Sequence, residues 1–407
     1  MTESVAAAVD HVDLADPRVF ADPDHHRYFR HLRDHDPLHW NPAGVEPGFW
    51  SVTRYEDCAA VQKDSVTFSS AGTNVLGQQR WTGDEGSGRM LTHTDGERHT
   101  ELRRIVNQSF TPRAVAGLEP YLRSVIGQSL DQALEEGEVD FVDTVALLPV
   151  ASIAALLGVP QEDWPLLLKL TSAAFGSADQ EVQTSPNARV SAAVAHSQLL
   201  LYCQDLMEQR RASPRDDILT RLGEAQRSGQ LSEEGAMLFL DLLLLGGNET
   251  TRHGAVGALL ALIEFPQQWQ LLRADRRLLN SAVAEVLRYV SPSKHVLRRA
   301  ERDIELHGRR ISAGQDVAVW HFSANRDERA FTDPNVFDIE RKPNAHLALG
   351  SGPHYCLGAS LATLELAVYL DELCNKVASA AVAAPPALLA TSVISGFKNL
   401  RVRLRSA

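Results

Sequence analysis

The chain has 407 residues, of which 44% are hydrophobic and 23% are charged, values typical of soluble globular proteins. Its 52 aspartates and glutamates outnumber its 40 lysines and arginines, and the net charge of −12 argues against a nucleic-acid-binding protein, which would present a basic surface to phosphate. The four scattered cysteines indicate no disulfide framework, the first residues show no signal peptide, and no apolar run reaches the roughly 18 residues of a membrane span, so we expect a soluble, acidic, cytoplasmic protein.

In chain order, the first predicted element is a short hairpin in residues 48–55, where the residues alternate in character after the segment DPLHW. Apolar residues three and four positions apart then predict helices over most of residues 95–223. Residues 176–189 interrupt this pattern with a polar stretch that has no apolar period, and we interpret it as a surface connection.

One unusually long helix is predicted next, with Ser232 as its N-cap and Pro266 as the residue that stops it. At 1.5 Å per residue it would span about 50 Å. Its middle, LDLLLLGG, is apolar nearly all round, which indicates a helix that crosses the interior of the molecule. Gly246 and Gly247 each cost about 1 kcal/mol relative to alanine in such a helix, which suggests that they serve a purpose other than helix stability.

The last third of the chain predicts short strands in DIELHGRRI and DVAVWHF, an irregular segment over 323–349, a helix after Cys356 and a hairpin over 388–406. We find no internal repeat, low-complexity tract or linker. The prediction is therefore a single domain over residues 1–407, mainly α with a small β region, in which about the first 15 residues form an N-terminal tail.

The most informative segment surrounds Cys356 with three glycines, Gly350, Gly352 and Gly358, immediately before a helical pattern. Glycines permit tight turns that aim backbone N–H groups at the sulfur, and a helix N-terminus stabilises a thiolate. Such a thiolate is suited to be an iron ligand. The alternative is a buried cysteine beside a glycine-rich turn, and zinc is less favoured because no second Cys or His pair lies at ligand spacing.

The loop GSGPHYCLG resembles the haem-binding loop of the cytochrome P-450 family, Phe-Gly-x-Gly-x-His/Arg-x-Cys-x-Gly. The match covers the three glycines, His354 and Cys356, and it departs at Leu349, where the family usually has phenylalanine. The resemblance implies haem b (heme b, iron protoporphyrin IX) with Cys356 as its axial iron ligand. It also implies that the haem lies between the long central helix and the helix after the cysteine.

Further motifs follow in family order, and the resemblance runs from about residue 36 to the end. Glu285 and Arg288, three apart on one helical face, resemble the family's Glu-x-x-Arg pair, which Arg341 would join as a third member that braces the cysteine loop. Without the resemblance they would be read as an ordinary solvent-exposed pair. The haem propionates need cations, and by resemblance the residues that contact them are His99, Arg103, Arg298 and His354.

The sequence GGNETT resembles the oxygen-activation motif of the family. Gly246 and Gly247 would let the haem and O2 approach a locally opened helix, Thr250 would hydrogen-bond dioxygen, and Glu249 would relay protons from solvent. The alternative is an exposed glutamate and a threonine bonded back to its own helix.

The resemblance therefore implies a haem-thiolate monooxygenase that inserts one atom of O2 into an apolar small molecule, in secondary metabolism or in lipid, terpenoid or steroid oxidation. We expect an external ferredoxin and ferredoxin reductase, since no stretch is long enough for a fused flavin domain, and no nucleic-acid or membrane partner. A peroxide-driven peroxygenase, against which Glu249 and Thr250 argue, and a non-catalytic haem-binding sensor are the alternatives.

By resemblance, the substrate pocket would be lined by residues 72–90, 242–246, 293–297 and 393–397. The substrate itself could be free or bound to a carrier protein. Lys294 and His295 are unusually polar for such a lining, and we expect them to face solvent or a propionate rather than the substrate.

Overall fold

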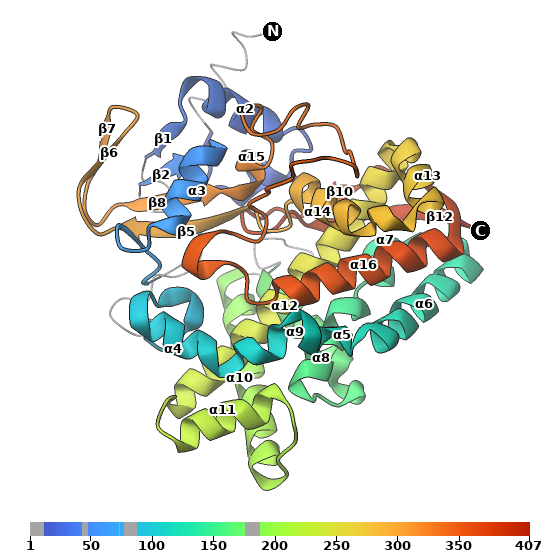
Figure 1. Cartoon of the computed structure of the whole chain (residues 1–407), viewed down its shortest axis with the longest axis horizontal. Helices are drawn as coiled ribbons and strands as arrows, with labels where there is room; N and C mark the ends of the chain where they lie inside the picture. Colours follow the sequence, from blue (N-terminus) through green and yellow to red (C-terminus); the bar gives the residue numbers. More distant parts are fainter. Residues whose placement is uncertain (1–11, 43–47, 73, 77–87, 176–187) are drawn as a thin grey trace.

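The structure is a computed structural model that describes residues 12–42, 48–72, 74–76, 88–175 and 188–407. Helices make up most of it, and the strands gather into small sheets beside them (Figure 1). The longer helices are α2 (His26–His35), α3 (Tyr55–Lys63), α4 (Gly96–Asn107), α6 (Glu119–Glu136), α8 (Leu147–Leu157), α9 (Trp164–Phe175), α10 (Ala188–Ala212), α11 (Ile218–Arg227), α12 (Glu233–Glu264), α13 (Pro266–Ala274), α14 (Leu279–Val290) and α16 (Ala359–Lys376). The mainly helical fold with a small β region is confirmed.

The long helix α12 confirms the prediction at both ends. The Ser232 hydroxyl accepts the backbone N–H of Gly235 at 2.9 Å, and the helix ends at Glu264, two residues before Pro266. At 1.5 Å per residue its 32 residues span about 48 Å. Its neighbour α14 approaches closely because residue 257 is glycine: an added Cβ would lie 2.6 Å from Val290 Cγ1.

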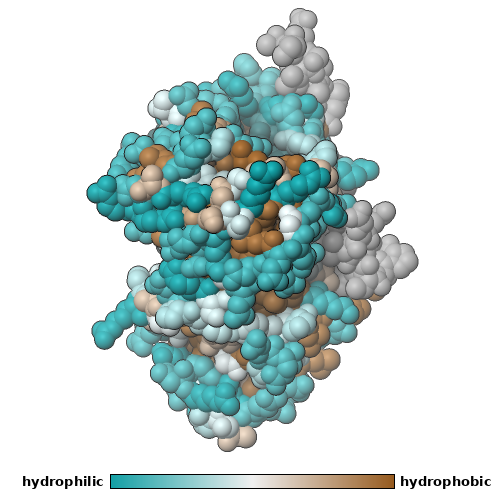
Figure 2. Space-filling view, turned by 90° about the vertical axis from the view of Figure 1, so that its right-hand side faces the viewer, coloured by the Kyte–Doolittle hydropathy of each residue, from teal (hydrophilic) through white to brown (hydrophobic). Residues whose placement is uncertain are grey.

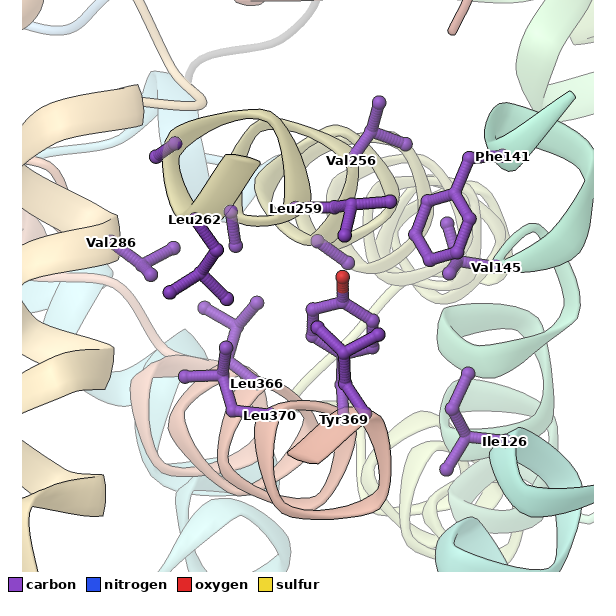
Figure 3. Packing of buried hydrophobic residues seen from close by; sticks show 14 of the residues in the cluster. Ile126, Phe141, Val145, Val256, Leu259, Leu262, Val286, Leu366, Tyr369 and Leu370 are labelled. Atoms are coloured by element: carbon purple, nitrogen blue, oxygen red, sulfur yellow. The ribbon is translucent and has the colours of Figure 1, made fainter. Parts of the chain in front are cut away.

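The main hydrophobic core fills the space between α12, α16, α14 and α6 (Figure 3). Leu366 and Leu370 of α16 face Leu262 of α12 and Val286 of α14, and all four are nearly inaccessible to solvent. The ring of Tyr369 stands between α16 and Leu259, with its hydroxyl towards α12. This core fixes α12 against α16, the two helices that the family resemblance places on either side of the haem.

The largest sheet has the strand order β1-β2-β8-β5-β3, in which only β2 and β8 run parallel. Its central strand β8 is buried along its whole length, because alternate side chains pack into different clusters. Val317 and Val319 pack on the side of α3, whereas Ala318 and Trp320 pack on the side of α2. The strands of this sheet are β1 (Leu38–Asn41), β2 (Phe49–Val52), β3 (Phe68–Ser69), β5 (His295–Ala300) and β8 (Asp316–Trp320).

Three smaller sheets complete the β structure: β4-β12-β9, β10-β11 and the hairpin β6-β7. The DIELHGRRI and DVAVWHF strands are thereby confirmed as β6, β7 and β8. The remaining strands are β4 (Glu138–Asp140), β6 (Ile304–Leu306), β7 (Arg309–Ile311), β9 (Val377–Val382), β10 (Ala387–Leu388), β11 (Phe397–Asn399) and β12 (Arg401–Ser406).

Both hairpin predictions need correction. The N-terminal hairpin pairs β1 with β2, so its first strand lies in the DPLHW segment and Tyr55 already begins α3. At the C-terminus β11 pairs with β10, but β12 joins β4 and β9 in another sheet. The predicted connection over 176–189 lies outside the described residues except at 188 and 189, which belong to α10.

Leu14 and Ala15, which the sequence assigns to an N-terminal tail, are 2% and 7% exposed and pack with Phe20 and Phe29. The surface shown in Figure 2 is mostly hydrophilic, with hydrophobic residues in small patches. Within the part of the chain that the structure describes, no helix has the length and apolar character needed to cross a membrane.

Candidate active site

Cys356 lies in a tight loop directly before α16, as predicted. Its backbone N–H donates to the carbonyl of Leu349 at 2.9 Å, which closes the loop on itself. Gly350 and Gly352 have φ of +73° and +71°, conformations that L side chains rarely adopt. At Gly352 an added Cβ would also lie 2.7 Å from the carbonyl oxygen of Gln62 in α3, so only glycine lets the loop approach that helix.

The sulfur of Cys356 is held where a thiolate can be stabilised. Burial raises the pKa of its thiol, while the N–H of Gly358 and the guanidinium of Arg103 act in the opposite direction. The side chain is partly exposed, and neighbouring Tyr355 is 45% exposed, so the loop lies near the surface. A metal that binds the sulfur would replace its proton.

Behind the loop, the predicted brace of Glu285, Arg288 and Arg341 is present. Arg288 donates twice to Glu285 at 2.7 Å, and both side chains are completely buried. Arg341 adds a bond to the same carboxylate at 3.3 Å. Arg288 also donates to the carbonyl of Asn325 at 2.9 Å, and the Asn325 side chain accepts the N–H of Leu347 at 2.7 Å. The brace therefore reaches the segment that leads into the cysteine loop.

Beside the loop the structure brings together the side chains predicted to contact propionates. Arg103 donates to the carbonyl of Tyr355 at 2.7 Å, and the rings of His99 and His354 lie 4.3 Å apart. Arg298 is only 5% exposed, and the one hydrogen bond recorded for its guanidinium among the described residues goes to the carbonyl of Leu297 at 2.8 Å. These groups form a cluster of basic side chains whose members come from α4, β5 and the loop, with Arg103 and Arg298 as its permanent charges.

The cluster has the electrostatics of an anion-binding site. Burial lowers the pKa of Arg298 to about 10, and burial together with His354 and Arg103 lowers the pKa of His99 to about 4. The buried Nε2 of His99 finds no partner within the described chain. Carboxylates placed here would accept hydrogen bonds from His99 and Arg298 and would offset the positive charges of Arg103 and Arg298.

His354 is anchored by an acid that the sequence reasoning missed. Its Nε2 lies 2.8 Å from Asp95 Oδ1, just before α4. Burial alone would raise the pKa of Asp95, but hydrogen bonds from His354, Ser70 and Ser69 lower it to about 2. Asp95 is the first residue of the segment DGERH and the N-cap of α4, and its position at a helix start was the available signal.

On α12, the glycine pair provides an open surface. A Cβ added at Gly246 would meet no heavy atom within 4 Å, and one at Gly247 would make ordinary contact with Ile153 of α8. The helix is continuous here, so the expectation of a locally opened helix is wrong. The Thr250 hydroxyl instead donates to the carbonyl of Gly246 at 3.1 Å, the back-bonded arrangement named as the alternative.

That alternative would require an exposed glutamate. Glu249 is instead buried, with an exposed fraction of only 2%. The Ser172 hydroxyl of α9 donates to its Oε1 at 2.9 Å, and Arg252 and His253 lie 3.6 Å and 3.3 Å from its carboxylate. Burial would raise the pKa of Glu249, but these neighbours lower it, so the carboxylate is ionised. The sequence reasoning missed Ser172 and His253, although His253 follows Glu249 by one helical turn.

These residues fit a haem group. A cysteine sulfur on a loop, basic side chains with an unpartnered His99 Nε2 beside it, and a glycine surface on α12 match the iron, carboxylates and flat face of such a cofactor. Cys356 would bind the iron, and His99, Arg103, Arg298 and His354 would contact the propionates.

Lys294 and His295 do not face solvent or a propionate, and that expectation is wrong. Lys294 is 2% exposed, and its Nζ donates to the carbonyls of Thr391 and Ile394 at 2.9 Å and 2.8 Å. His295 is fully buried, with Nδ1 2.8 Å from the carbonyl of Ser392 and Nε2 accepting the N–H of Leu76 at 2.8 Å. Both side chains hold in place segments that lie 97 to 219 residues away in the sequence and that include parts of the predicted pocket lining.

Parts of the predicted substrate pocket can be placed. In the predicted segment 242–246, Gly246 lies on the open side of α12. The predicted segments 293–297 and 393–397 lie side by side, because the N–H of Lys294 donates to the carbonyl of Val393 at 2.9 Å. Of 72–90, residues 73 and 77–87 lie outside the described residues.

Comparison with known proteins supports the same assignment. A family model described as Cytochrome P450 matches residues 187–375. Cytochrome P450 NovI of Streptomyces niveus is 36% identical over 97% of both chains, and linalool 8-monooxygenase of Pseudomonas putida is 33% identical over 96% of this chain and 98% of its own. Steroid C26-monooxygenase of Rhodococcus jostii is 34% identical over 97% of this chain and 85% of its own.

Two solved structures are similar over nearly their whole length. One is P450 OxyD, described as involved in the biosynthesis of vancomycin-type antibiotics, with a TM-score of 0.89 and 35% identity over 97% of this chain and 100% of its own. The other is P450BioI in complex with a fatty acid ligated to acyl carrier protein, with a TM-score of 0.84 and 28% identity over 96% of this chain and 99% of its own.

Proposed function

This chain belongs to the cytochrome P450 family and is a haem-thiolate monooxygenase, and we propose that it inserts one atom of O2 into a small apolar molecule by hydroxylation or epoxidation. The observation that carries the proposal is the cysteine loop, with its sulfur beside the guanidinium of Arg103 and close to the cluster of Arg298, His99 and His354. The names of the terpenoid and steroid monooxygenases among its relatives support an apolar substrate.

In this mechanism the bound haem supplies O2 activation, and the Cys356 thiolate favours O–O cleavage. Arg298, with its guanidinium buried and short of acceptors, would fix one propionate. The Thr250 hydroxyl, at the open surface beside Gly246, would donate its hydrogen bond towards the reacting oxygen instead of to its own helix. Glu249 would hold the next proton on its carboxylate and pass it towards Thr250.

Substitution of Thr250 by alanine tests this assignment. Without the hydroxyl, the protein should still bind haem and substrate, but electrons should be lost to peroxide, so that the ratio of product formed to reductant consumed falls several-fold. The neighbouring Thr251 is a matched control, because its side chain is buried and bonded to Glu365 rather than placed at the open surface. Equal coupling in Thr250→Ala and wild type would assign Thr250 to helix structure alone.

The second part of the proposal concerns the electron donor, an external ferredoxin with its reductase. It would dock over the cysteine loop, where Tyr355 is exposed and α4 runs alongside, since Arg103 bonds the loop carbonyls. Arg104 and Lys342 are exposed cations on this part of the chain and would attract an acidic partner despite the overall charge of −12.

Charge reversal at these positions should slow reduction by an acidic ferredoxin, mainly through the association rate. The effect should shrink as salt is added, because exposed charges are screened beyond about 8–10 Å at physiological ionic strength. Stopped-flow reduction of Arg104→Glu and Lys342→Glu measures it. Arg227→Glu on α11, also exposed, changes the net charge equally and is the control. If all three variants are reduced at the wild-type rate at every ionic strength, this face is not the docking surface.

The substrate could arrive free or attached to a carrier protein, and the P450BioI complex supports including the second form. Spectral titration with terpenoids, steroids and amino acids, each free and carrier-bound, tests the proposal. Ferredoxin-dependent product then supports a monooxygenase, product formed only with added peroxide supports a peroxygenase, and no product with either supports a haem-binding sensor.

A further inference from the structure

The histidine that follows Glu249 by one helical turn has no role in the family motif, and its surroundings give it one. His253 is 1% exposed and lies between Glu249 and the start of β11. Its Nε2 is 3.3 Å from Glu249 Oε2, and the backbone N–H of Phe397 points at its Nδ1 at 3.2 Å. Phe397 ends the pocket segment 393–397, so one imidazole bridges the acid and the pocket wall.

The partners of the ring fix its tautomer. A backbone N–H can only donate, so Nδ1 of His253 must be the unprotonated acceptor. The proton of the neutral ring then sits on Nε2, which lies 3.3 Å from Glu249 Oε2 but is not aligned for a hydrogen bond in this structure. This proton position is deduced from the Phe397 hydrogen bond, and it places an N–H without any positive charge on the ring beside the Glu249 carboxylate.

The charged groups around the pair keep it in this state. Burial lowers the pKa of His253, with Arg252 and Lys294 acting in the same direction and Glu249 against it. On the other side of Glu249, Arg252 lies 3.6 Å from the carboxylate and also 3.6 Å from Asp143, whose side chain is 83% exposed. The buried cluster therefore consists of an anionic Glu249, a neutral His253 and a cationic Arg252. On the side away from Glu249, Arg252 lies beside the solvent-exposed Asp143.

We propose that His253 is the positioning residue of the proton relay: it holds Glu249 turned away from Thr250 while the carboxylate is anionic, and releases it once the carboxylate takes a proton. The proton comes from solvent water on the Arg252 and Asp143 side and binds to a Glu249 oxygen. The neutral acid then loses its attraction to Arg252 and attracts the Nε2–H group less strongly, so it can turn and donate. This proposal rests on the proposed role of Glu249.

Two substitutions separate the two contacts of His253. In His253→Gln the side-chain amide can still donate to Glu249 from the place of Nε2, whereas in His253→Asn the amide oxygen can accept from Phe397 in the place of Nδ1 but no donor reaches Glu249. In His253→Asn, the rate of peroxide formation and its solvent isotope effect should depend on pH differently from the wild type, with differences of several-fold. The substrate affinity should be unchanged. His253→Gln should keep the wild-type pH profile.

A spectroscopic measurement checks the tautomer without turnover. In 15N-histidine-labelled protein, carrying haem in the diamagnetic ferrous–CO form, the His253 resonances should show an unprotonated Nδ1 and a protonated Nε2 from about pH 6 to 8. The His253→Asn spectrum identifies them by their loss. A protonated Nδ1 would overturn the proposal, and so would wild-type pH profiles in His253→Asn.

Glu249→Gln distinguishes this failure from failure of the proposed function. If Glu249→Gln uncouples the enzyme and His253→Asn does not, the proposal for His253 is wrong and the role of Glu249 stands. If Glu249→Gln is itself fully coupled, the relay lies elsewhere, and the proposal for His253 falls with it.

Discussion

Cys356→Ala should abolish the red-shifted ferrous–CO absorption band, which is the signature of a haem iron bound to a thiolate. The reason is that no other cysteine of the chain lies in a comparable place: Cys58, Cys203 and Cys374 are buried, at 0%, 0% and 2% exposure, in helices. The spectrum of the purified, haem-reconstituted variant measures the effect.

Cys374→Ala is the matched control for this experiment, because it removes a cysteine from α16, the helix that follows the loop. It should keep the band of the wild type. An unchanged band in Cys356→Ala would contradict the assignment of the ligand and with it the haem-thiolate site proposed for this loop.

Glu285→Ala should cost about 3–5 kcal/mol of unfolding free energy, because it leaves the fully buried Arg288 without its carboxylate. Glu285 also accepts from the backbone N–H of Asp338 and the side chain of Asn344 at 2.9 Å and 3.0 Å, so several donors lose their acceptor together. Because the brace supports the cysteine loop, haem content should fall as well. Denaturant unfolding and the ratio of haem to protein measure the two effects.

An exposed pair with the same spacing offers the control. Arg98 and Glu101 are also three residues apart on a helix and 2.9 Å from each other, but their side chains are 38% and 48% exposed. Glu101→Ala should therefore cost no more than about 1 kcal/mol. Similar small losses in the two variants would show that the Glu285 site does not brace the structure.

The parts of the fold that the sequence predicts well carry local signals. Ser232 and Pro266 bound α12, and the glycines around Cys356 mark a loop whose dihedral angles need them. Contacts between segments that are far apart in the sequence have no such local signal. β12 pairs with β4, about 260 residues earlier, although its neighbour in sequence is β11. Nothing in the C-terminal segment alone distinguishes that partner from a nearby one.

The candidate site shows the same division. The motif residues were predicted by type and spacing, whereas their supporting partners come from elsewhere: Asp95 for His354, and Ser172 for Glu249. The location of Lys294 was predicted wrongly, because a lysine is rarely buried unless its ammonium group has hydrogen-bond acceptors. Here two carbonyl oxygens of a segment nearly a hundred residues later satisfy it, and the ring of Phe20 lies 4.8 Å from Nζ.

The hydrogen bonds of Lys294 and His295 to residues 391–394 have a consequence for how the substrate selectivity of this enzyme could be changed. Both side chains hydrogen-bond to backbone carbonyl oxygens, and every amino acid has such an oxygen. The side chain of Val393, which is the partly exposed one of this stretch, can therefore be exchanged without breaking these bonds, whereas Thr391, Ser392 and Ile394 are buried and the Thr391 hydroxyl accepts the N–H of Val393. Libraries aimed at new substrates can randomise Val393 if Lys294 and His295 are kept.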